Sequence, residues 1–156
     1  MPHFTPDQIK PDASDGVGNP CGPYRAELLS DTGGLTQFGC FIEVLPPGSK
    51  SSLKHWHQEE DELVYMLAGE VVLREGESEV VMRPGDTATF KAGVAVGHCL
   101  ENRSGAEARY MVVGTRSVAD VVTYPDHDRI LRYDRATDTR VYTTLAGKPS
   151  ISAYKG

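Results

Sequence analysis

The stretch Lys54–Gly69, KHWHQEEDELVYMLAG, carries two histidines one residue apart, then an acidic run, then an apolar run that ends in glycine. Side chains two residues apart lie on the same face of a β-strand, so His55 and His57 are expected to project together, with Trp56 on the other face. A short loop over residues 58–61 would return the chain and bring Glu62 beside the two imidazoles. The stretch therefore predicts two histidines and a carboxylate on one face of a sheet.

The sequence on either side of this stretch reads as a series of short strands. β-prone runs alternate with turn signals such as Gly76-Glu77 and Pro84-Gly85 about every 8–12 residues, which indicates an all-β sandwich or barrel. The predicted strands are Arg25–Leu29, Leu35–Leu45, Ser51–His57, Leu63–Leu67, Glu70–Glu75, Glu79–Met82, Thr87–Lys91, Gly97–Asn102 and Arg109–Thr115.

The two ends of the chain differ from this central part. Residues 1–24 hold five prolines and three glycines, which predicts an extended N-terminal arm. Residues 25–117 are expected to form the barrel, and residues 118–156 a polar C-terminal tail that packs on the barrel or on a partner subunit. Within this tail we expect a short helical turn at Val118–Val122 and edge strands at Ile130–Tyr133 and Arg140–Leu145.

A third histidine, His98, lies 41 residues after His57 in another predicted strand. Three imidazoles and Glu62 would then converge and leave coordination positions open for water or substrate. Such a set suits one divalent transition metal, Mn²⁺, Fe²⁺, Ni²⁺ or Zn²⁺, and the ligand types do not distinguish among these ions.

The same residues resemble the two motifs of the cupin superfamily. The first motif is matched by Gly48…His55-Trp56-His57…Glu62…Gly69, with the spacing His-x-His-x₄-Glu-x₆-Gly. The second motif is matched by Gly85…Gly93…His98…Asn102. The resemblance covers residues 35–115 and implies a double-stranded β-helix, or jelly-roll barrel, with a metal ion inside it. The ligands that it implies are His55, His57, Glu62 and His98.

Three features depart from the cupin pattern. Gly48 stands one residue further from His55 than is usual, and Lys91 occupies a position that is usually proline. Four residues separate Gly93 from His98 in place of two, so we expect a longer loop at the mouth of the pocket, over residues 94–97. None of these departures removes a ligand.

The acidic residues between the ligands need a separate interpretation. Glu59, Glu60 and Asp61 are expected to form a solvated loop, with the alternative that one of them accepts a hydrogen bond from a ligand histidine and fixes its tautomer. Asn102 is expected to form structural hydrogen bonds near the end of the barrel. His127, between two aspartates, is expected to be exposed in a turn, with the alternatives that it belongs to a lid or forms a hydrogen bond to a metal ligand.

Strand alternation gives the expected lining of the pocket. With the ligands facing inward, Val64 and Met66 share the face of Glu62, and Leu100 shares the face of His98. In the strand Leu35–Leu45, the apolar set that we place in the core is Phe38, Cys40, Ile42 and Val44. Of this set, Phe38 and Cys40 are expected to line the pocket. A mostly apolar wall beside a metal suits a small organic acid, sugar or carbonyl compound.

Composition argues against several classes of function. The 156 residues carry a net charge of −6, without the cluster of lysine and arginine that a nucleic-acid-binding surface needs. The apolar runs are far shorter than the roughly 20 residues that span a bilayer, and the N-terminus has no apolar segment typical of a signal peptide. Three cysteines without a CxxC pair predict free thiols. We therefore expect a cytoplasmic protein with no nucleic-acid or membrane partner.

The resemblance is strongest to single-domain bacterial cupins of the sugar-phosphate-isomerase-like group. It implies a metal-dependent enzyme that acts on a small polar metabolite, with Glu62 or a nearby carboxylate as the catalytic base. Such an isomerase also needs a cation for the substrate's phosphate, and Lys54, Lys91 and Arg109 are the nearest in sequence. Two alternatives are an Fe-dependent oxygenase and a non-catalytic module that binds a metabolite. Cupins of this size are often dimers, so we expect a homodimer.

Overall fold

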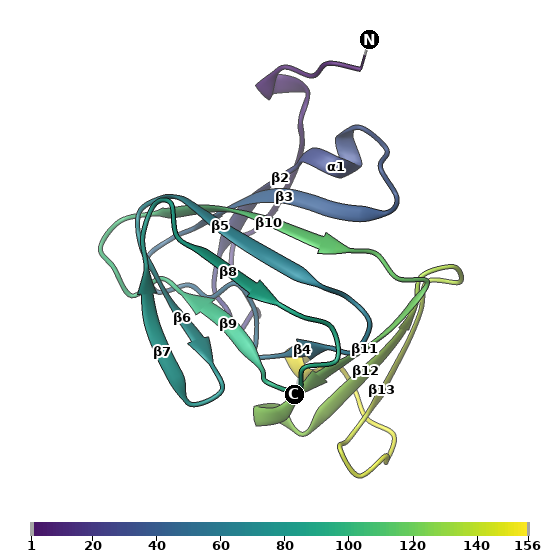
Figure 1. Ribbon diagram of the computed structural model, residues 1–156. Helices are drawn as coiled ribbons and strands as arrows, with labels where there is room; N and C mark the ends of the chain where they lie inside the picture. Colours follow the sequence, from purple (N-terminus) through teal and green to yellow (C-terminus); the bar gives the residue numbers. More distant parts are fainter. Residues whose placement is uncertain (1, 156) are drawn as a thin grey trace.

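The computed structural model describes residues 2–155, and β-strands dominate the fold (Figure 1). The strands are β1 (Lys10–Ser14), β2 (Tyr24–Leu28), β3 (Phe38–Leu45), β4 (Trp56–His57), β5 (Glu62–Ala68), β6 (Val71–Glu75), β7 (Ser78–Met82), β8 (Thr87–Phe90), β9 (His98–Glu101), β10 (Ala108–Thr115), β11 (Ala119–Tyr124), β12 (Arg129–Asp134) and β13 (Thr139–Thr143). The helical elements are short: η1 (Pro6–Gln8), α1 (Leu29–Thr32), η2 (Pro125–His127) and η3 (Ala153–Lys155).

Two walls of antiparallel strands enclose the core. One wall is a six-stranded sheet with the order β1-β2-β3-β10-β5-β8. The other wall consists of a three-stranded sheet, β7-β6-β9, and a four-stranded sheet, β13-β12-β11-β4, below the large sheet in Figure 1. From β5 to β11 the chain crosses repeatedly between the walls, which is the topology of a jelly roll. The predicted all-β, double-stranded β-helix is confirmed.

Apolar side chains fill the space between the walls. On β5, Val64 and Met66 are 2% and 0% exposed, and on β10 Ala108, Tyr110 and Val112 point to the same interior. This period of two is what a strand with one face on a core requires. Asn102 closes one end of the barrel, as predicted, because its buried amide donates hydrogen bonds to two main-chain carbonyls at 2.7 and 2.8 Å.

β3 alternates in the opposite sense to the prediction. Glu43 and Leu45 are 7% and 0% exposed, and Phe41 packs against the core, whereas Phe38 is 39% exposed. The predicted core placement of Phe38, Cys40, Ile42 and Val44 is therefore wrong. The outer face of β3 is apolar for a different reason: α1 packs against this strand, and the Cys40 amide donates to the Ser30 hydroxyl at 2.8 Å.

The C-terminal segment is part of the folded body. β11 pairs with β4, with Val122 opposite His57 and Thr123 opposite Trp56. The predicted helical turn at Val118–Val122 is wrong, because Asp120, Val122 and the following Tyr124 alternate as buried residues of a strand. The tail thus reaches the segment that carries the first two histidines.

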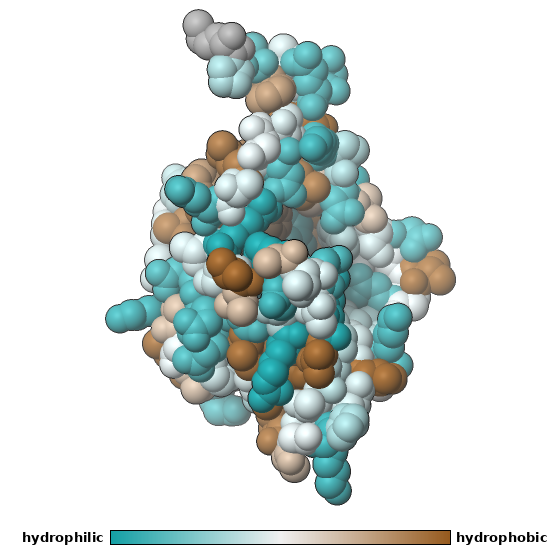
Figure 2. Space-filling view, turned by 90° about the vertical axis from the view of Figure 1, so that its right-hand side faces the viewer, coloured by the Kyte–Doolittle hydropathy of each residue, from teal (hydrophilic) through white to brown (hydrophobic). Residues whose placement is uncertain are grey.

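The N-terminal segment combines an extended part with a paired strand. β1 pairs with β2 along its whole length, while the residues before it stand away from the body (Figures 1 and 2). Figure 2 also shows apolar side chains lying in separate patches among polar ones on that side of the molecule. Within residues 2–155, no helix has the length and apolar character needed to cross a membrane.

Candidate metal centre

The four predicted ligands come together where β4, β5 and β9 meet. His55, Glu62 and His98 offer ligand atoms that lie within 4.8 Å of one another. His57 joins them through its Nε2 atom, which is 3.1 Å from Nε2 of His55. His98 Nε2 lies 3.6 Å from Oε1 of Glu62. An antiparallel bridge between His55 and His98 explains how residues far apart in sequence meet here.

Hydrogen bonds determine which nitrogen of two histidines faces the cluster. His55 Nδ1 lies 2.9 Å from the carbonyl oxygen of Leu53, and His57 Nδ1 lies 2.6 Å from Oδ2 of Asp120. These oxygens only accept hydrogen bonds, so each neutral imidazole carries its proton on Nδ1 and presents a lone pair at Nε2.

The two facing lone pairs require a positive charge between them. At 3.1 Å, Nε2 of His55 and Nε2 of His57 would repel each other unless a proton or a metal ion were shared. Two nitrogens bound about 2.0–2.1 Å from one metal, at roughly a right angle, are themselves about 3 Å apart. The observed spacing therefore fits two ligands of one metal ion.

His98 supplies the second sign of a metal. It is 4% exposed, and among residues 2–155 neither of its ring nitrogens has a hydrogen-bond partner. Phe90 stacks on it, with ring centroids 3.5 Å apart and planes 2° from parallel. A buried imidazole without partners costs free energy, which coordination to a metal would offset. The residues present thus fit the divalent ion that the sequence predicts.

The ionisation of these groups also suits a cation. Burial and the neighbouring imidazoles lower the pKa of His55 to about 4, so this ring is neutral near pH 7. Burial alone would raise the pKa of Glu62, but the close imidazole of His98, together with those of His55 and His57, lowers this pKa overall. For His57, burial lowers the pKa, but the hydrogen bond and charge of Asp120 outweigh it and raise the pKa. In the absence of a metal ion, His57 therefore takes up a second proton more readily than a free imidazole does.

Asp120 is the residue of this site that the sequence analysis missed. It is 3% exposed on β11, and its carboxylate accepts hydrogen bonds from the His57 ring and from the main-chain N–H of Glu59 at 2.9 Å. The alternative that an acidic residue of the loop has this role is not what the structure shows for Glu60, which pairs with Arg135 at 2.8 Å. Asp120 thus sets the tautomer of His57 from a strand 63 residues later in the sequence.

A second group of ligand atoms lies beside the first. His57, Glu60 and Asp120 also place one atom each within 4.8 Å of one another. The carboxylate of Glu60 accepts hydrogen bonds from Ser117 N and Arg135, and that of Asp120 is occupied as described above. These contacts fit a role in orienting His57.

A cavity of about 130 Å³ lies inside the barrel beside the candidate ligands. Its walls include His55, Glu62 and His98 together with Val64 and Leu100, two of the residues predicted to line it. The cavity has room for a few water molecules or a small polar ligand.

The other three predicted pocket residues lie elsewhere. Met66 is fully buried in the core, at 0% exposure, and Phe38 and Cys40 lie on the outer face of β3. Phe41 and Glu43 line the cavity in their place. For Phe38 and Cys40 the cause is the reversed alternation of β3, which turns every second side chain to the other face of the sheet.

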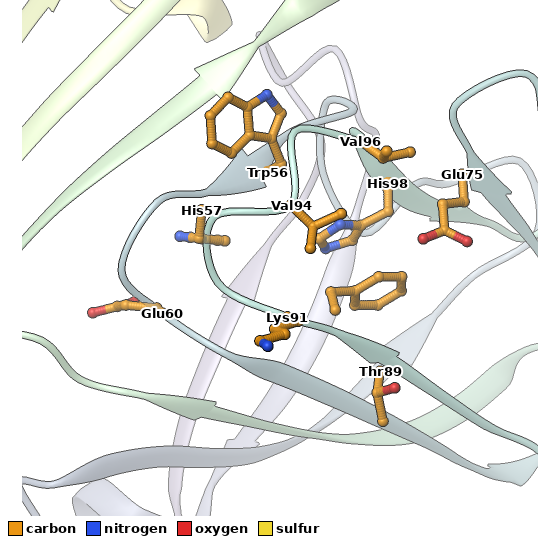
Figure 3. Close-up of a pocket in the computed structure, with 10 residues that line it drawn as sticks. Trp56, His57, Glu60, Glu75, Thr89, Lys91, Val94, Val96 and His98 are labelled. Carbon is orange, nitrogen blue, oxygen red and sulfur yellow. The ribbon is translucent and has the colours of Figure 1, made fainter.

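An outer pocket of about 150 Å³ connects the histidines to the surface (Figure 3). His57 and His98 line it together with Lys91 and Val94, and His98 also lines the inner cavity. In Figure 3, Val94 lies near both histidines, at the loop that was predicted to shape the mouth of the pocket. Lys91, which replaces the usual proline, places an ammonium group at this opening.

Comparison with known proteins agrees with this geometry. Residues 41–114 match the family model for the cupin domain. An oxalate-binding protein from Thermotoga maritima is 33% identical over 89 residues, which cover 56% of this chain and 71% of that protein. The chain belongs to the cupin superfamily.

Two solved structures resemble this cupin along almost its whole length. A sugar phosphate isomerase of the cupin superfamily from Silicibacter pomeroyi is 35% identical, with a TM-score of 0.86, over 99% of this chain and 100% of that one. A protein from Acidithiobacillus ferrooxidans, provisionally named a sugar phosphate isomerase, is 25% identical, with a TM-score of 0.82, over 94% and 92% of the two chains. The likeness thus includes the N-terminal segment and the β11–β13 strands of this cupin.

Proposed function

We propose that this cupin is a metal-dependent enzyme that isomerises a small sugar phosphate. The observation that carries the proposal is the meeting of the ring nitrogens of His55, His57 and His98 with the Glu62 carboxylate beside a cavity. The likeness to a sugar phosphate isomerase over the full length of both chains supports the choice of reaction.

The outer pocket offers an anionic substrate one lysine, Lys91, beside the carboxyl groups of Glu60 and Glu75. Lys91 lines it with His57 and His98, so an anionic group held by the ammonium would leave the rest of the substrate near the candidate metal. Lys54, another cation considered from the sequence, pairs with Asp126 at 3.0 Å, and Arg109 pairs with Glu27 at 3.0 Å. Lys91 is therefore the lysine that we assign to the phosphate.

The chemistry needs a metal and a base. When bound by the three histidines and Glu62, a divalent metal would polarise the substrate carbonyl and stabilise charge on its oxygen. The apolar side chains of Val64 and Leu100 would limit the access of water to the reacting carbon. A carboxylate that coordinates a metal is a weaker base, so the predicted catalytic role of Glu62 competes with its role as a ligand.

Metal analysis and a coupled assay test this proposal. Protein purified without chelator should carry about one transition metal per chain, and the metal-loaded protein should convert an aldose phosphate into a ketose phosphate. His55→Ala should lose the metal, whereas His127→Ala, in the exposed η2 turn, should keep it. If the metal-loaded protein converted none of a panel of sugar phosphates, the proposed isomerase activity would be refuted.

A binding module is the second candidate, because the curated relative from Thermotoga maritima is an oxalate-binding protein. In that case the metal-loaded protein should show saturable binding of a small dicarboxylate, measured by calorimetry, without product formation. The identity of the bound metal distinguishes the oxygenase alternative from the isomerase and the binding module, because the oxygenase needs Fe²⁺. The predicted homodimer is tested by light scattering, where a mass near the 17.0 kDa of one chain would contradict it.

A further inference from the structure

Glu43 is a buried carboxyl on the wall opposite the histidines. It stands in the middle of β3, with Tyr110 of β10 on one side and Ala26 of β2 on the other. Its side chain is 7% exposed and lines the inner cavity together with His55, Glu62 and His98. A ligand in that cavity would therefore lie between the metal ligands and Glu43.

No structural contact accounts for a carboxyl at this position. Glu43 takes part in none of the ion pairs formed within residues 2–155. Lys50 lies near it along a second pocket, but its ammonium pairs with Glu101 at 3.3 Å. An apolar side chain would be the more stabilising choice in such a wall, so Glu43 points to a role other than packing.

Tyr110 adds a second unsatisfied polar group beside Glu43. The residue is 0% exposed, and its hydroxyl faces the carboxyl without forming a well-aligned hydrogen bond to any residue in the described part of the chain. The surrounding wall is apolar, with Val64 and Val112. Two polar groups on such a wall are satisfied when a polar ligand occupies the cavity.

A second pocket, of about 380 Å³, lies on the other side of Glu43. Phe41, Glu43 and Ser51 line both this pocket and the inner cavity, and Lys50 and Tyr24 line the second pocket alone. Glu43 thus stands between the reaction cavity and a space open to solvent. A proton taken up from a substrate could be exchanged with water on that side.

We propose that Glu43 is a catalytic residue that moves the proton during isomerisation, and that Tyr110 is its positioning residue. This inference rests on the proposed function. The Glu43 carboxylate removes a proton from the hydroxyl-bearing carbon next to the carbonyl, the C–H electron pair becomes the C=C bond of an enediolate, and the carbonyl π electrons move onto the carbonyl oxygen. The proton of the neighbouring hydroxyl passes to that oxygen. Glu43 then returns its proton to the former carbonyl carbon, and the neighbouring carbon becomes the new carbonyl. One carbon is oxidised and its neighbour is reduced, so no external oxidant or reductant takes part.

The ionisation of Glu43 agrees with that role. Burial raises its pKa to about 7, the Tyr110 hydroxyl opposes part of this rise, and the charges of Glu62 and Asp12 add to it. Both forms of the carboxyl are then populated near neutral pH, which suits a group that takes and returns a proton. The titratable groups around it are Tyr110, Glu62, Asp12, Tyr24, Lys50, Cys21 and Tyr154, with His55 and His98 across the cavity.

The test compares Glu43→Gln and Glu43→Asp with wild type and with Glu27→Gln, a control on β2 whose carboxylate pairs with Arg109 outside the barrel. Glutamine keeps the shape of the side chain and carries no charge, so metal content should stay at the wild-type level and the melting temperature at or above it. In Glu43→Gln, kcat should fall by about 10²–10⁴-fold with KM changed little, and Glu43→Asp should retain part of the activity. An active wild type whose Glu43→Gln variant has the same kcat would overturn the inference.

Infrared titration tests Glu43 without any turnover. The metal-free wild type should show the C=O stretch of a protonated carboxyl that titrates near pH 7, and Glu43→Gln should lack that band. Tyr110→Phe should shift its titration to higher pH, because the hydroxyl opposes the rise of this pKa. A band that persists in Glu43→Gln, or that does not move in Tyr110→Phe, contradicts the assigned role. A wild type inactive on every sugar phosphate refutes the proposed function, a result distinct from both.

Discussion

Replacing Asp120 by asparagine tests how the orientation of His57 depends on a side chain of β11. In the wild type, one carboxylate oxygen accepts from His57 Nδ1 at 2.6 Å and the other from Glu59 N–H at 2.9 Å. Asparagine has one oxygen, and when that oxygen keeps the Glu59 contact, the amide NH₂ faces the ring. The ring proton must then move to Nε2, which removes the lone pair that faces the metal.

The expected loss of metal affinity follows from the loss of that single hydrogen bond. Removal of a partner that orients a ligand histidine weakens metal binding by about 10–100-fold, or roughly 1.4–2.8 kcal/mol. The dissociation constant for Zn²⁺ or Mn²⁺ is measured by competition with a chromophoric chelator. Glu59→Gln is the matched control, because its exposed side chain can change while its N–H still donates to Asp120. A folded Asp120→Asn protein that binds metal as tightly as wild type would refute the reasoning.

Three further predictions concern stability. Gly69→Ala should lower the free energy of unfolding by about 2–4 kcal/mol, since φ is +71° and a Cβ would lie 2.4 Å from the carbonyl oxygen of Glu107, whereas Gly105→Ala, in open space, should change it little. Asn102→Ala removes the buried amide that donates to the Leu45 carbonyl and should cost about 1–3 kcal/mol in chemical denaturation. In the absence of metal, the free energy of unfolding of wild type, relative to that of Glu43→Gln, should fall by about 3 kcal/mol from pH 4.5 to 7. The reason is that Glu43 keeps a proton in the folded protein over this range, whereas the unfolded chain releases it. If urea denaturation gave the two proteins the same dependence of stability on pH, the prediction would be wrong.

Strand alternation explains why the candidate ligands could be found in the sequence. His55 and His57 stand two residues apart, and the spacing to Glu62 is that of the first cupin motif. His98 lies in a separate strand, and its place in the set came from the resemblance to the second motif. The burial of His98 beneath Phe90, which makes it the clearest sign of a metal, depends on tertiary packing.

The two errors have separate physical causes. Asp120 lies among residues that read as a short helical turn, so its period of two with Val122 was not recognised, and neither was its contact with His57 63 residues earlier. In β3, apolar residues occur on both faces, and the richer face was placed inside. Because a buried carboxyl is unfavourable for stability, no rule of pattern alone would turn Glu43 inward, and such conflicts concentrate at functional sites.

Trp56 is the single tryptophan of the chain, and it stands between His55 and His57 in the sequence and lines the outer pocket. Its fluorescence is therefore an intrinsic optical reporter placed next to the candidate metal. Paramagnetic ions such as Mn²⁺, Fe²⁺ and Ni²⁺ quench a nearby indole, whereas Zn²⁺, with a filled d shell, does not. The molecule thus allows the capture and release of each ion to be followed in real time, without a label and without knowledge of the substrate.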